Sequence, residues 1–162
     1  MLPHTKKKKT SNGLLFLIME RESEILKFKK LTPNATSPIH ASPYSAGFDL
    51  FAAEDKVVHS QSNALIKTDI AIELPPFTYG RIAPRSSLAL SSINILGGVI
   101  DRDYTGGIGV IIFKHSINDF KIQKGHRIAQ LIIEKICIPK LIEVDYISKT
   151  DRGEKGFGSS GK

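Results

Sequence analysis

The sequence has one cysteine and no apolar run long enough to cross a membrane. Because Cys137 has no second cysteine to pair with, an intrachain disulfide and a zinc site with four thiolate ligands are both excluded. A chain without disulfides is typical of a reducing compartment. The longest apolar run near the start spans residues 14–19, whereas a transmembrane helix needs about 20 apolar residues. We therefore predict an intracellular location, cytoplasmic and/or nuclear, and no membrane partner.

Common nucleotide-binding and hydrolase motifs are also absent. There is no GxxxxGK(S/T) segment and no GxGxxG turn after a strand, so a P-loop and a Rossmann fold are not supported. The GxSxG turn that carries the serine nucleophile of α/β-hydrolases is missing as well. The five histidines lack the spacing of metal ligands, which argues against a zinc site.

The 162 residues fit one domain with room for a hydrophobic core. Hydrophobic residues make up 41% and charged residues 24% of the chain, which excludes disorder throughout its length. The formal charge is +7 and is unevenly distributed. Residues 1–30 have eight basic and three acidic side chains, residues 31–145 have eleven of each sign, and residues 146–162 have four basic and two acidic ones. A neutral body with basic ends predicts no specific nucleic-acid partner.

Residues 1–23 are predicted to form a disordered basic extension. The lysines Lys6, Lys7, Lys8 and Lys9 are either a weak nuclear-import signal or a solvated tail. A secretion signal is disfavoured because no small-residue cleavage site follows the apolar run, and charged residues come directly after it at positions 20–22.

Strand patterns dominate residues 24–148, which we predict to form one all-β domain. Apolar and polar residues alternate roughly with period two in three segments, at 24–29, 64–74 and 108–113. Glycine and proline pairs punctuate these runs as turns. Only residues 85–93 have a pattern that suits a helix. Many short strands in one chain predict a sandwich or a closed barrel.

Residues 149–162 are predicted to be a mobile, glycine-rich arm. The last twelve residues hold four glycines and two serines around the single aromatic Phe157, a composition that buries little surface. Such a segment is either a frayed terminus or an arm that becomes ordered on an anionic ligand. The second interpretation suits phosphate, because backbone N–H groups, hydroxyls and an arginine all donate to its oxygens.

Two further segments have polar residues in arrangements that suit catalysis. Residues 84–87, Pro-Arg-Ser-Ser, stand where a helix is predicted to begin, which suits either phosphate binding or plain helix capping by serine. Residues 97–109 are predicted to form a hairpin with a polar tip between two apolar strands. In this hairpin Asp101 is either a general base or an ordinary turn residue. Tyr104 either covers a small pocket or is an ordinary surface aromatic.

Five short segments share a characteristic order and spacing. They are SAGFDL at 45–50, GRIAPRSSL at 80–88, GVIDRDYTG at 98–106, GHRIAQLI at 125–132 and RGEKGFGSSG at 152–161. Together they resemble the motifs of the trimeric deoxyuridine triphosphatases (dUTPases). Each motif alone is weak, but all five at these spacings are very specific, and the resemblance covers about residues 24–162.

The resemblance implies a jelly-roll-like β-barrel subunit with one short helix. Such subunits form homotrimers with three active sites at their interfaces, and a flexible C-terminal arm closes over a neighbour's site. The implied reaction is hydrolysis of dUTP to dUMP and diphosphate, which keeps uracil out of DNA and supplies dUMP for thymidylate synthesis. The implied cofactor is Mg2+ bound to the triphosphate.

The resemblance also implies a role for each matching residue. Asp101 activates the water that attacks the α-phosphorus, and Asp49 contacts Mg2+ through bound water. Tyr104 packs under the deoxyribose, and the backbone around Gly98 and Gly109 forms hydrogen bonds with uracil. The other implied substrate contacts are Arg85, Ser86, Ser87, Gln130, Arg152, Phe157, Gly158, Ser159 and Ser160.

Several positions depart from the family pattern. His126 stands where Asp is usual, Ser87 where Gly is common, and Thr105 and Gly107 where an Arg and a polar or acidic residue are usual. The change at His126 predicts pH sensitivity near about pH 6.5, where histidine ordinarily titrates. Because the residues with implied roles remain, we predict an active enzyme with an altered rate or pH profile.

Two alternatives to this function remain open. The departures in the third and fourth motifs suit a catalytically weakened protein that binds dUTP and signals through a partner. The related dCTP deaminases share a similar fold but release ammonia from dCTP. The presence of Asp101, Tyr104 and Phe157 argues against the deaminase.

Overall fold

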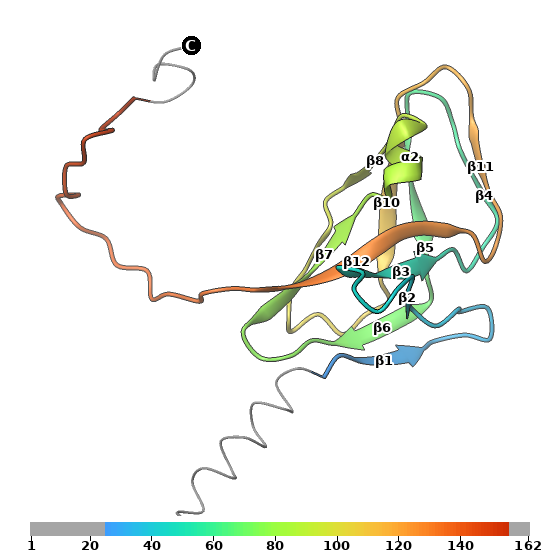
Figure 1. Cartoon of the computed structure of the whole chain (residues 1–162), viewed down its shortest axis with the longest axis horizontal. Coiled ribbons are helices and arrows are strands. Elements are labelled where there is room, and N and C mark those ends of the chain that lie inside the picture. Colours follow the sequence, from blue (N-terminus) through green and yellow to red (C-terminus); the bar gives the residue numbers. More distant parts are fainter. Residues whose placement is uncertain (1–24, 156–162) are drawn as a thin grey trace, which may run out of the picture.

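The computed structural model describes residues 25–155, and residues 1–24 and 156–162 lie outside the described part. Within residues 25–155 the chain is nearly all β, with one short helix (Figure 1). The strands are β1 Lys27–Lys30, β2 Ile39–His40, β3 Gly47–Phe51, β4 Lys56–Val58, β5 Asn63–Lys67, β6 Ile70–Glu73, β7 Thr78–Ala83, β8 Ile93–Leu96, β9 Val99–Ile100, β10 Gly109–Lys114, β11 Phe120–Ile122 and β12 Arg127–Lys135. The helix, α2, spans Ser86–Leu90. No helix in this part of the chain is long and apolar enough to cross a membrane.

The strands pair antiparallel in four sheets. The largest sheet has the order β2-β3-β12-β7-β9 and the next has the order β5-β10-β8, while β1 pairs with β6 and β11 pairs with β4. The predicted all-β, jelly-roll-like fold with one short helix is confirmed. The predicted closed barrel needs a correction, because no described strand is hydrogen-bonded into both of the larger sheets.

A single hydrophobic core lies between the sheets. In β10, Val110 and Ile112 are fully buried while Ile111 between them is exposed, as expected for a strand with one face on the core. Leu50 of β3 and Leu131 of β12 enter the same core from the largest sheet. Burying one such side chain contributes about 1.5–3 kcal/mol. The core therefore holds β3, β10 and β12 in place, and these strands position the candidate site.

The predicted strand over residues 64–74 is two strands, β5 and β6. Asp69 separates them with a φ of +53°, a region that residues with a Cβ seldom adopt. Its carboxylate accepts a hydrogen bond from the Thr32 hydroxyl at 2.6 Å, and the Thr68 hydroxyl donates to the Ile108 carbonyl at 2.7 Å. Buried residues continue to alternate across this break, so periodicity alone could not reveal it.

The predicted hairpin over residues 97–109 is confirmed in its outer strands. β8 and β10 pair antiparallel, with Leu96 opposite Ile111. Between them, β9 leaves this pair and joins β7, with Val99 opposite Arg81. The loop between β8 and β10 therefore links the two larger sheets.

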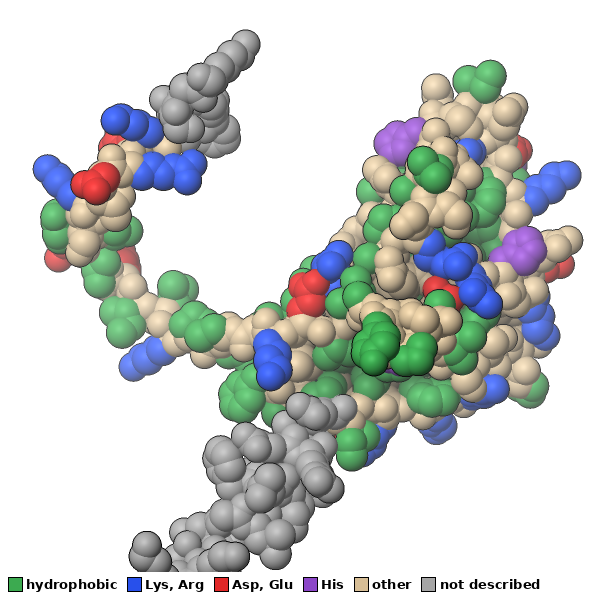
Figure 2. Space-filling model, in the orientation of Figure 1, with side chains coloured by type: hydrophobic (Ala, Val, Ile, Leu, Met, Phe, Trp, Pro, Cys, Tyr) green, Lys and Arg blue, Asp and Glu red, His purple; other side chains and the backbone are tan. Residues whose placement is uncertain are grey.

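The chain leaves the sheets after β12, and the side chains from residue 136 to residue 155 are exposed. Many of these side chains are apolar (Figure 2), including Ile138, Leu141, Ile142, Val144, Tyr146 and Ile147. Pro139 has no N–H group with which to continue a sheet. The prediction placed residues 136–148 in the β domain, but their side chains are exposed like those of the following residues. The predicted boundary between domain and arm at residue 149 stays a prediction.

A polar cluster on β7 and β12 ties these strands together outside the core. The Tyr79 hydroxyl donates to Oε2 of Glu134 at 2.5 Å, and Nε of Arg81 donates to Oε1 at 2.6 Å. The Tyr79 hydrogen bond, followed by that from Arg81, holds the pKa of Glu134 below its ordinary value of 4.5. The hydrogen bond to Glu134 raises the pKa of Tyr79.

Replacing Glu134 by glutamine is expected to flatten the acid dependence of stability. Because the pKa of Glu134 is lower in the folded chain, its charged form stabilises the fold above the unfolded pKa, and this contribution is lost as the pH falls through the folded pKa. Denaturant unfolding between pH 7 and pH 3 should show a smaller loss in Glu134→Gln than in the wild type. The control is Glu143→Gln, in the exposed tail of residues 136–155 that follows β12. Equal dependence of the unfolding free energy on pH in the wild type and in Glu134→Gln would contradict the expectation.

Candidate active site

Asp49 is a buried carboxylate held between two arginines. It lies in β3 with 6% of its surface exposed. Its Oδ1 lies 3.1 Å from Nε of Arg85, and its Oδ2 lies 3.2 Å from Nη1 of Arg127. A buried carboxylate is costly unless cations face it, and here two cations face one anion. The cluster therefore has a net positive charge, which suits an anionic ligand such as phosphate.

The strand order β3-β12-β7 brings three of the sequence motifs together. Gln130 of β12 stands opposite Asp49 of β3 on one side and opposite Ala83 of β7 on the other. Its Nε2 donates a hydrogen bond to the Pro84 carbonyl at 3.0 Å, which holds the chain just before Arg85. The predicted site residues Asp49, Arg85 and Gln130 thus lie in one cluster.

Ser86 and Ser87 begin α2 directly after Arg85, and both are exposed. The alternative role predicted for serine here, capping of the helix, is wrong. The N-cap residue is Arg85, and no side chain forms a cap hydrogen bond. The two hydroxyls are therefore not engaged in capping and face solvent beside the positive cluster.

The cluster fits the Mg2+ that the resemblance implies, provided that phosphate supplies most of its ligands. Within residues 25–155 no group of three or more His, Cys, Asp or Glu side chains is arranged to hold a metal ion. Oδ2 of Asp49 is buried and, although it faces Arg127, accepts no hydrogen bond. Mg2+ commonly keeps several waters and uses one or two carboxylates together with substrate phosphates. The remaining lone pairs of Asp49 suit one such water.

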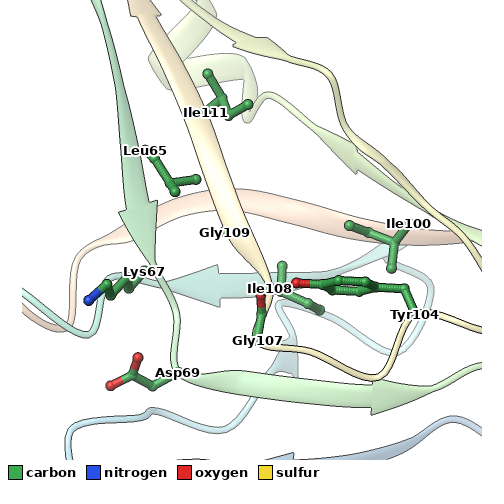
Figure 3. A pocket seen from close by; sticks show the side chains of 9 residues that line it. All are labelled: Leu65, Lys67, Asp69, Ile100, Tyr104, Gly107, Ile108, Gly109 and Ile111. Carbon is green, nitrogen blue, oxygen red and sulfur yellow. Dashed lines mark hydrogen bonds between the residues drawn. The ribbon is translucent and has the colours of Figure 1, made fainter.

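A separate pocket of about 420 Å³ lies at the start of β10. Tyr104 stands on one side of it and Leu65 and Lys67 stand on the other (Figure 3). The Tyr104 hydroxyl donates to the Gly107 carbonyl at 2.9 Å, which fixes the ring. Gly109 lines the same pocket, and a Cβ there would lie 2.5 Å from Cδ1 of Leu65. The pocket has the size of an ordinary small-molecule site.

Gly98 belongs to the same hairpin but does not line this pocket. Its φ is +82°, and an added Cβ would lie 2.6 Å from the Ile82 carbonyl oxygen. Its own carbonyl accepts a hydrogen bond from the Ile82 N–H at 2.7 Å. Gly98 is therefore required for close packing on β7, and its predicted contact with uracil stays a prediction.

Asp101 follows β9 and is exposed. Its carbonyl accepts a hydrogen bond from the Tyr104 N–H at 3.1 Å, which closes a turn. Its side chain lines a second hollow of about 700 Å³, which Glu73 and Ile136 also line. The predicted base therefore has open access to water and ligand.

The described site residues thus form separate groups. No residue of the cluster around Asp49 lines the pocket with Tyr104 or the hollow with Asp101. Arg152 lies in the exposed tail, where its Nε donates to the Lys155 carbonyl at 3.0 Å. The predicted substrate contacts Phe157, Gly158, Ser159 and Ser160 lie outside the described residues.

Comparison with known proteins assigns this chain to a family. Residues 33–161 match the family model described as dUTPase. The chain belongs to the dUTPase family. A deoxyuridine 5'-triphosphate nucleotidohydrolase of Arabidopsis thaliana is 53% identical over 140 residues, which cover 86% of this chain and 84% of the relative. The protein of the same name from Variola virus is 51% identical over 136 residues, which cover 84% of this chain and 92% of the relative.

Solved dUTPase structures share the fold. A mutant dUTPase of Staphylococcus bacteriophage 80alpha, solved with dUpNHpp, is 33% identical with a TM-score of 0.80, covering 86% of this chain and 99% of its own. A mutant dUTPase of phage phi11 of S. aureus, described as coordinating a structural Mg(II) ion, is 28% identical with a TM-score of 0.72, covering 76% of this chain and 98% of its own. The family and the enzyme class predicted from the five motifs are confirmed.

His126 forms the hydrogen bond that closes the turn before β12 of this dUTPase. Its Nδ1 accepts from the Gln123 N–H at 3.2 Å, and its own N–H donates to the Gln123 carbonyl at 3.0 Å. The aspartate usual at this position offers a similar acceptor. The imidazole accepts at Nδ1 only when it is neutral with its proton on Nε2. The pH sensitivity predicted for His126 stays a prediction.

Sequence reasoning gave no role in this dUTPase to Arg127 or Lys67. Arg127 lies three residues before Gln130, so regular alternation would put them on opposite faces of the strand. A shift of register between Arg127 and Ala129 changes that alternation, and Arg127 reaches Asp49. Lys67 lines the pocket because it lies two residues after Leu65 in β5, on the same exposed face of the strand. The bulge before Ala129 has no sequence signal in this chain.

Proposed function

We propose that this chain hydrolyses dUTP to dUMP and diphosphate, which keeps uracil out of DNA and supplies dUMP for thymidylate synthesis. The observation that carries the proposal is the buried Asp49 carboxylate between Arg85 and Arg127, next to the exposed hydroxyls of Ser86 and Ser87, in a chain of the dUTPase family. A positive site with free hydroxyl donors suits a triphosphate.

Asp101 is the general base of the proposed mechanism. Its carboxylate accepts a proton from water while the water oxygen attacks the α-phosphorus. The bond between that phosphorus and the α–β bridging oxygen breaks, and diphosphate leaves with the electron pair. Arg85 and Ser86 stabilise the charge on the phosphate oxygens. Positioning and charge neutralisation of this kind supply most of the catalysis in such displacements.

Mg2+ on the triphosphate is the proposed cofactor, and when bound it neutralises phosphate charge and aligns the phosphates. Asp49 would hold it through a bound water, because Oδ2 accepts no hydrogen bond within the described residues. The phi11 dUTPase described as coordinating a structural Mg(II) ion supports only that a member of this family binds the metal. The positive charges of Arg85 and Arg127 offset the negative charge of Asp49. We therefore expect Mg2+ to bind to this site chiefly when the triphosphate is bound and supplies further ligands.

The proposed functional unit is a homotrimer in which each site combines residues of three chains. The half-sites around Asp49 and Tyr104 share no residue within one chain, so a neighbour's hairpin is needed to complete a site. The tail exposes apolar side chains between residues 136 and 147 (Figure 2), which packing on a neighbour would cover. Arg152 and the residues Phe157, Gly158, Ser159 and Ser160 would then close over a neighbour's triphosphate.

Replacing Tyr104 by alanine is expected to admit UTP. In the proposed complex the ring, fixed by its hydrogen bond to Gly107, lies against the deoxyribose and leaves no space for a 2'-hydroxyl. Without the ring, kcat/KM for UTP relative to dUTP should rise about tenfold or more. Tyr44→Ala is the control, because Tyr44 is 98% exposed. Continued rejection of UTP by Tyr104→Ala would place the sugar selection elsewhere.

The function is tested with purified protein, dUTP and Mg2+. We expect dUMP and diphosphate in equal amounts, from a particle of about three times the 17.8 kDa chain mass by light scattering. Binding of dUTP without release of dUMP would favour the regulatory alternative instead. Release of ammonia from dCTP would favour a deaminase.

Residues 1–23 lie outside the family match and outside the described residues. Their disorder and the nuclear-import signal at Lys6 to Lys9 therefore stay predictions. We propose an intracellular location, cytoplasmic and/or nuclear, because dUTP is an intracellular substrate.

A further inference from the structure

Lys114 is a buried lysine at the end of β10. Only 7% of its surface is exposed, and it is the one lysine or arginine of residues 25–155 that is buried. None of the ion pairs found in that range includes it. Its Nζ instead donates to the Ser91 carbonyl at 2.6 Å. Burying a cation is costly, so this placement indicates a specific use for the charge.

Ser91 is the C-cap residue of α2, directly after the last helical residue, Leu90. The helix has five residues, and none of them is buried; Leu88 is the one helical residue found packed, partly buried, against the core. A helix of this length is unstable on its own.

The carbonyls of Leu88 and Ala89 accept hydrogen bonds from the N–H groups of Ser91 and Ser92, both at 3.0 Å, and the Ser91 carbonyl just beyond them accepts from Lys114. A cation near these carbonyls both donates hydrogen bonds and complements their partial negative charge. α2 has no basic residue in its own last turn, and Lys114 provides one from β10.

A second bond fastens the same end of the helix to the strand. The His115 N–H donates to the Ser92 carbonyl at 2.9 Å, and Ser92 has a φ of +59° that turns the chain from α2 into β8. Within the helix, the Ser91 hydroxyl donates to the Ser87 carbonyl at 3.1 Å. The end of α2 is thus attached to the strand that runs through the core.

The other end of α2 holds proposed phosphate ligands. The Arg85 carbonyl accepts hydrogen bonds from the N–H groups of Leu88 and Ala89, both at 3.0 Å. Ser86 and Ser87 are the first two helical residues. If the helix unwinds from its far end, these bonds are lost, and the backbone from Arg85 to Ser87 is no longer held in place.

We propose that Lys114 is a positioning residue for the triphosphate, acting through α2 on Arg85, Ser86 and Ser87. The proposal rests on the proposed function, because it assigns phosphate contacts to these three residues. It also predicts different effects on the two parts of the substrate, the triphosphate and the nucleoside. Gly109, at the pocket with Tyr104, is the first residue of β10 and Lys114 is the last, so the two lie roughly 16 Å apart at the usual rise per residue. Loss of Lys114 should weaken triphosphate binding and leave nucleoside binding unchanged.

The test compares Lys114→Met with the wild-type protein. We expect Kd for the analogue dUpNHpp and KM for dUTP to rise about tenfold, as for loss of a hydrogen bond from a charged group. Kd for dUMP should change by less than about twofold. Hydrogen exchange of the amides of residues 88–92 should accelerate. Lys114→Arg should restore most of the affinity, and Lys121→Met, at an exposed lysine of β11, should behave as the wild type.

Each outcome bears on the proposal separately from the function. Unchanged amide exchange in Lys114→Met would overturn the role of Lys114, and so would equal weakening of dUMP and dUpNHpp binding. If Lys114→Met does not fold, Lys114→Gln removes the charge from a side chain that stays polar, and the same measurements apply. A wild-type protein that binds dUpNHpp but releases no dUMP would contradict the proposed hydrolysis, while the exchange and binding comparisons would still decide the role of Lys114.

Discussion

Replacing Asp101 by asparagine is expected to lower kcat for dUTP by about 10²–10⁴-fold, the contribution of a well-placed general base. Asparagine has nearly the same size, but its amide cannot accept the proton of the attacking water. The turn should keep its shape, because the bond to the Tyr104 N–H uses the main-chain carbonyl of residue 101. Affinity for dUpNHpp should therefore stay near the wild-type value. Single-turnover rates of dUMP formation and titration with dUpNHpp measure the two quantities.

Asp103→Asn is the matched control, since Asp103 is an exposed aspartate in the same loop with no role in the proposed mechanism. Its kcat should stay within about twofold of the wild type, as for most surface changes away from a site. Turnover retained in Asp101→Asn would remove Asp101 from the role of base. A parallel loss in both variants would indicate that the loop as a whole has been disturbed.

Periodicity predicted the strands whose buried faces are regular. β10 is such a case, because Val110 and Ile112 alternate with an exposed residue. The observed strand begins at Gly109, one residue later than the predicted segment 108–113. The break at Asp69 escaped prediction because every second residue from 66 to 74 is buried, on both sides of the break. What divides β5 from β6 is a positive φ supported by side-chain hydrogen bonds from distant parts of the chain, and local sequence does not encode such contacts.

The candidate site shows the same division. The motifs identified Asp49, Arg85 and Gln130, and strand order then explains why they meet. The contacts that hold these residues were not predictable, because Arg127 reaches Asp49 through a shift of register and Lys114 acts on a helix distant in sequence. The motifs contain the residues proposed to contact substrate. The residues that position those side chains come from distant parts of the sequence and are brought near them only by tertiary packing. In the proposed homotrimer the complete site would also depend on contacts between chains, which the sequence of one chain does not show.

The contacts of Asp49 determine the second large effect. Removing one member of a buried ion pair costs about 3–5 kcal/mol when its partner stays buried. The side chains of Arg85 and Arg127 are 27% and 45% exposed, so both can turn toward solvent and reduce that cost. We therefore expect Asp49→Asn to lower the free energy of unfolding by about 2 kcal/mol. Denaturant titration measures this change.

The same substitution should weaken catalysis through Arg85. Without a carboxylate at 3.1 Å, the Arg85 guanidinium loses the contact that aims it, and KM for dUTP should rise about tenfold or more. A double-mutant cycle of Asp49→Asn with Arg127→Gln separates the two arginines. We expect a coupling energy of about 1 kcal/mol between Asp49 and Arg127. No coupling would mean that the ion pair at 3.2 Å has no energetic weight.

Titration with Mg2+ then distinguishes the two roles of Asp49. If Asp49 positions Arg85, dUpNHpp binds more weakly to Asp49→Asn even in the presence of a chelator. If Asp49 also holds a metal-bound water, the Mg2+ concentration for half-maximal rate rises as well. We expect both changes, because Oδ1 is paired with Arg85 while Oδ2 accepts no hydrogen bond from any residue between 25 and 155. Unchanged binding of dUpNHpp without Mg2+ would remove the positioning role and leave Asp49 to the metal alone.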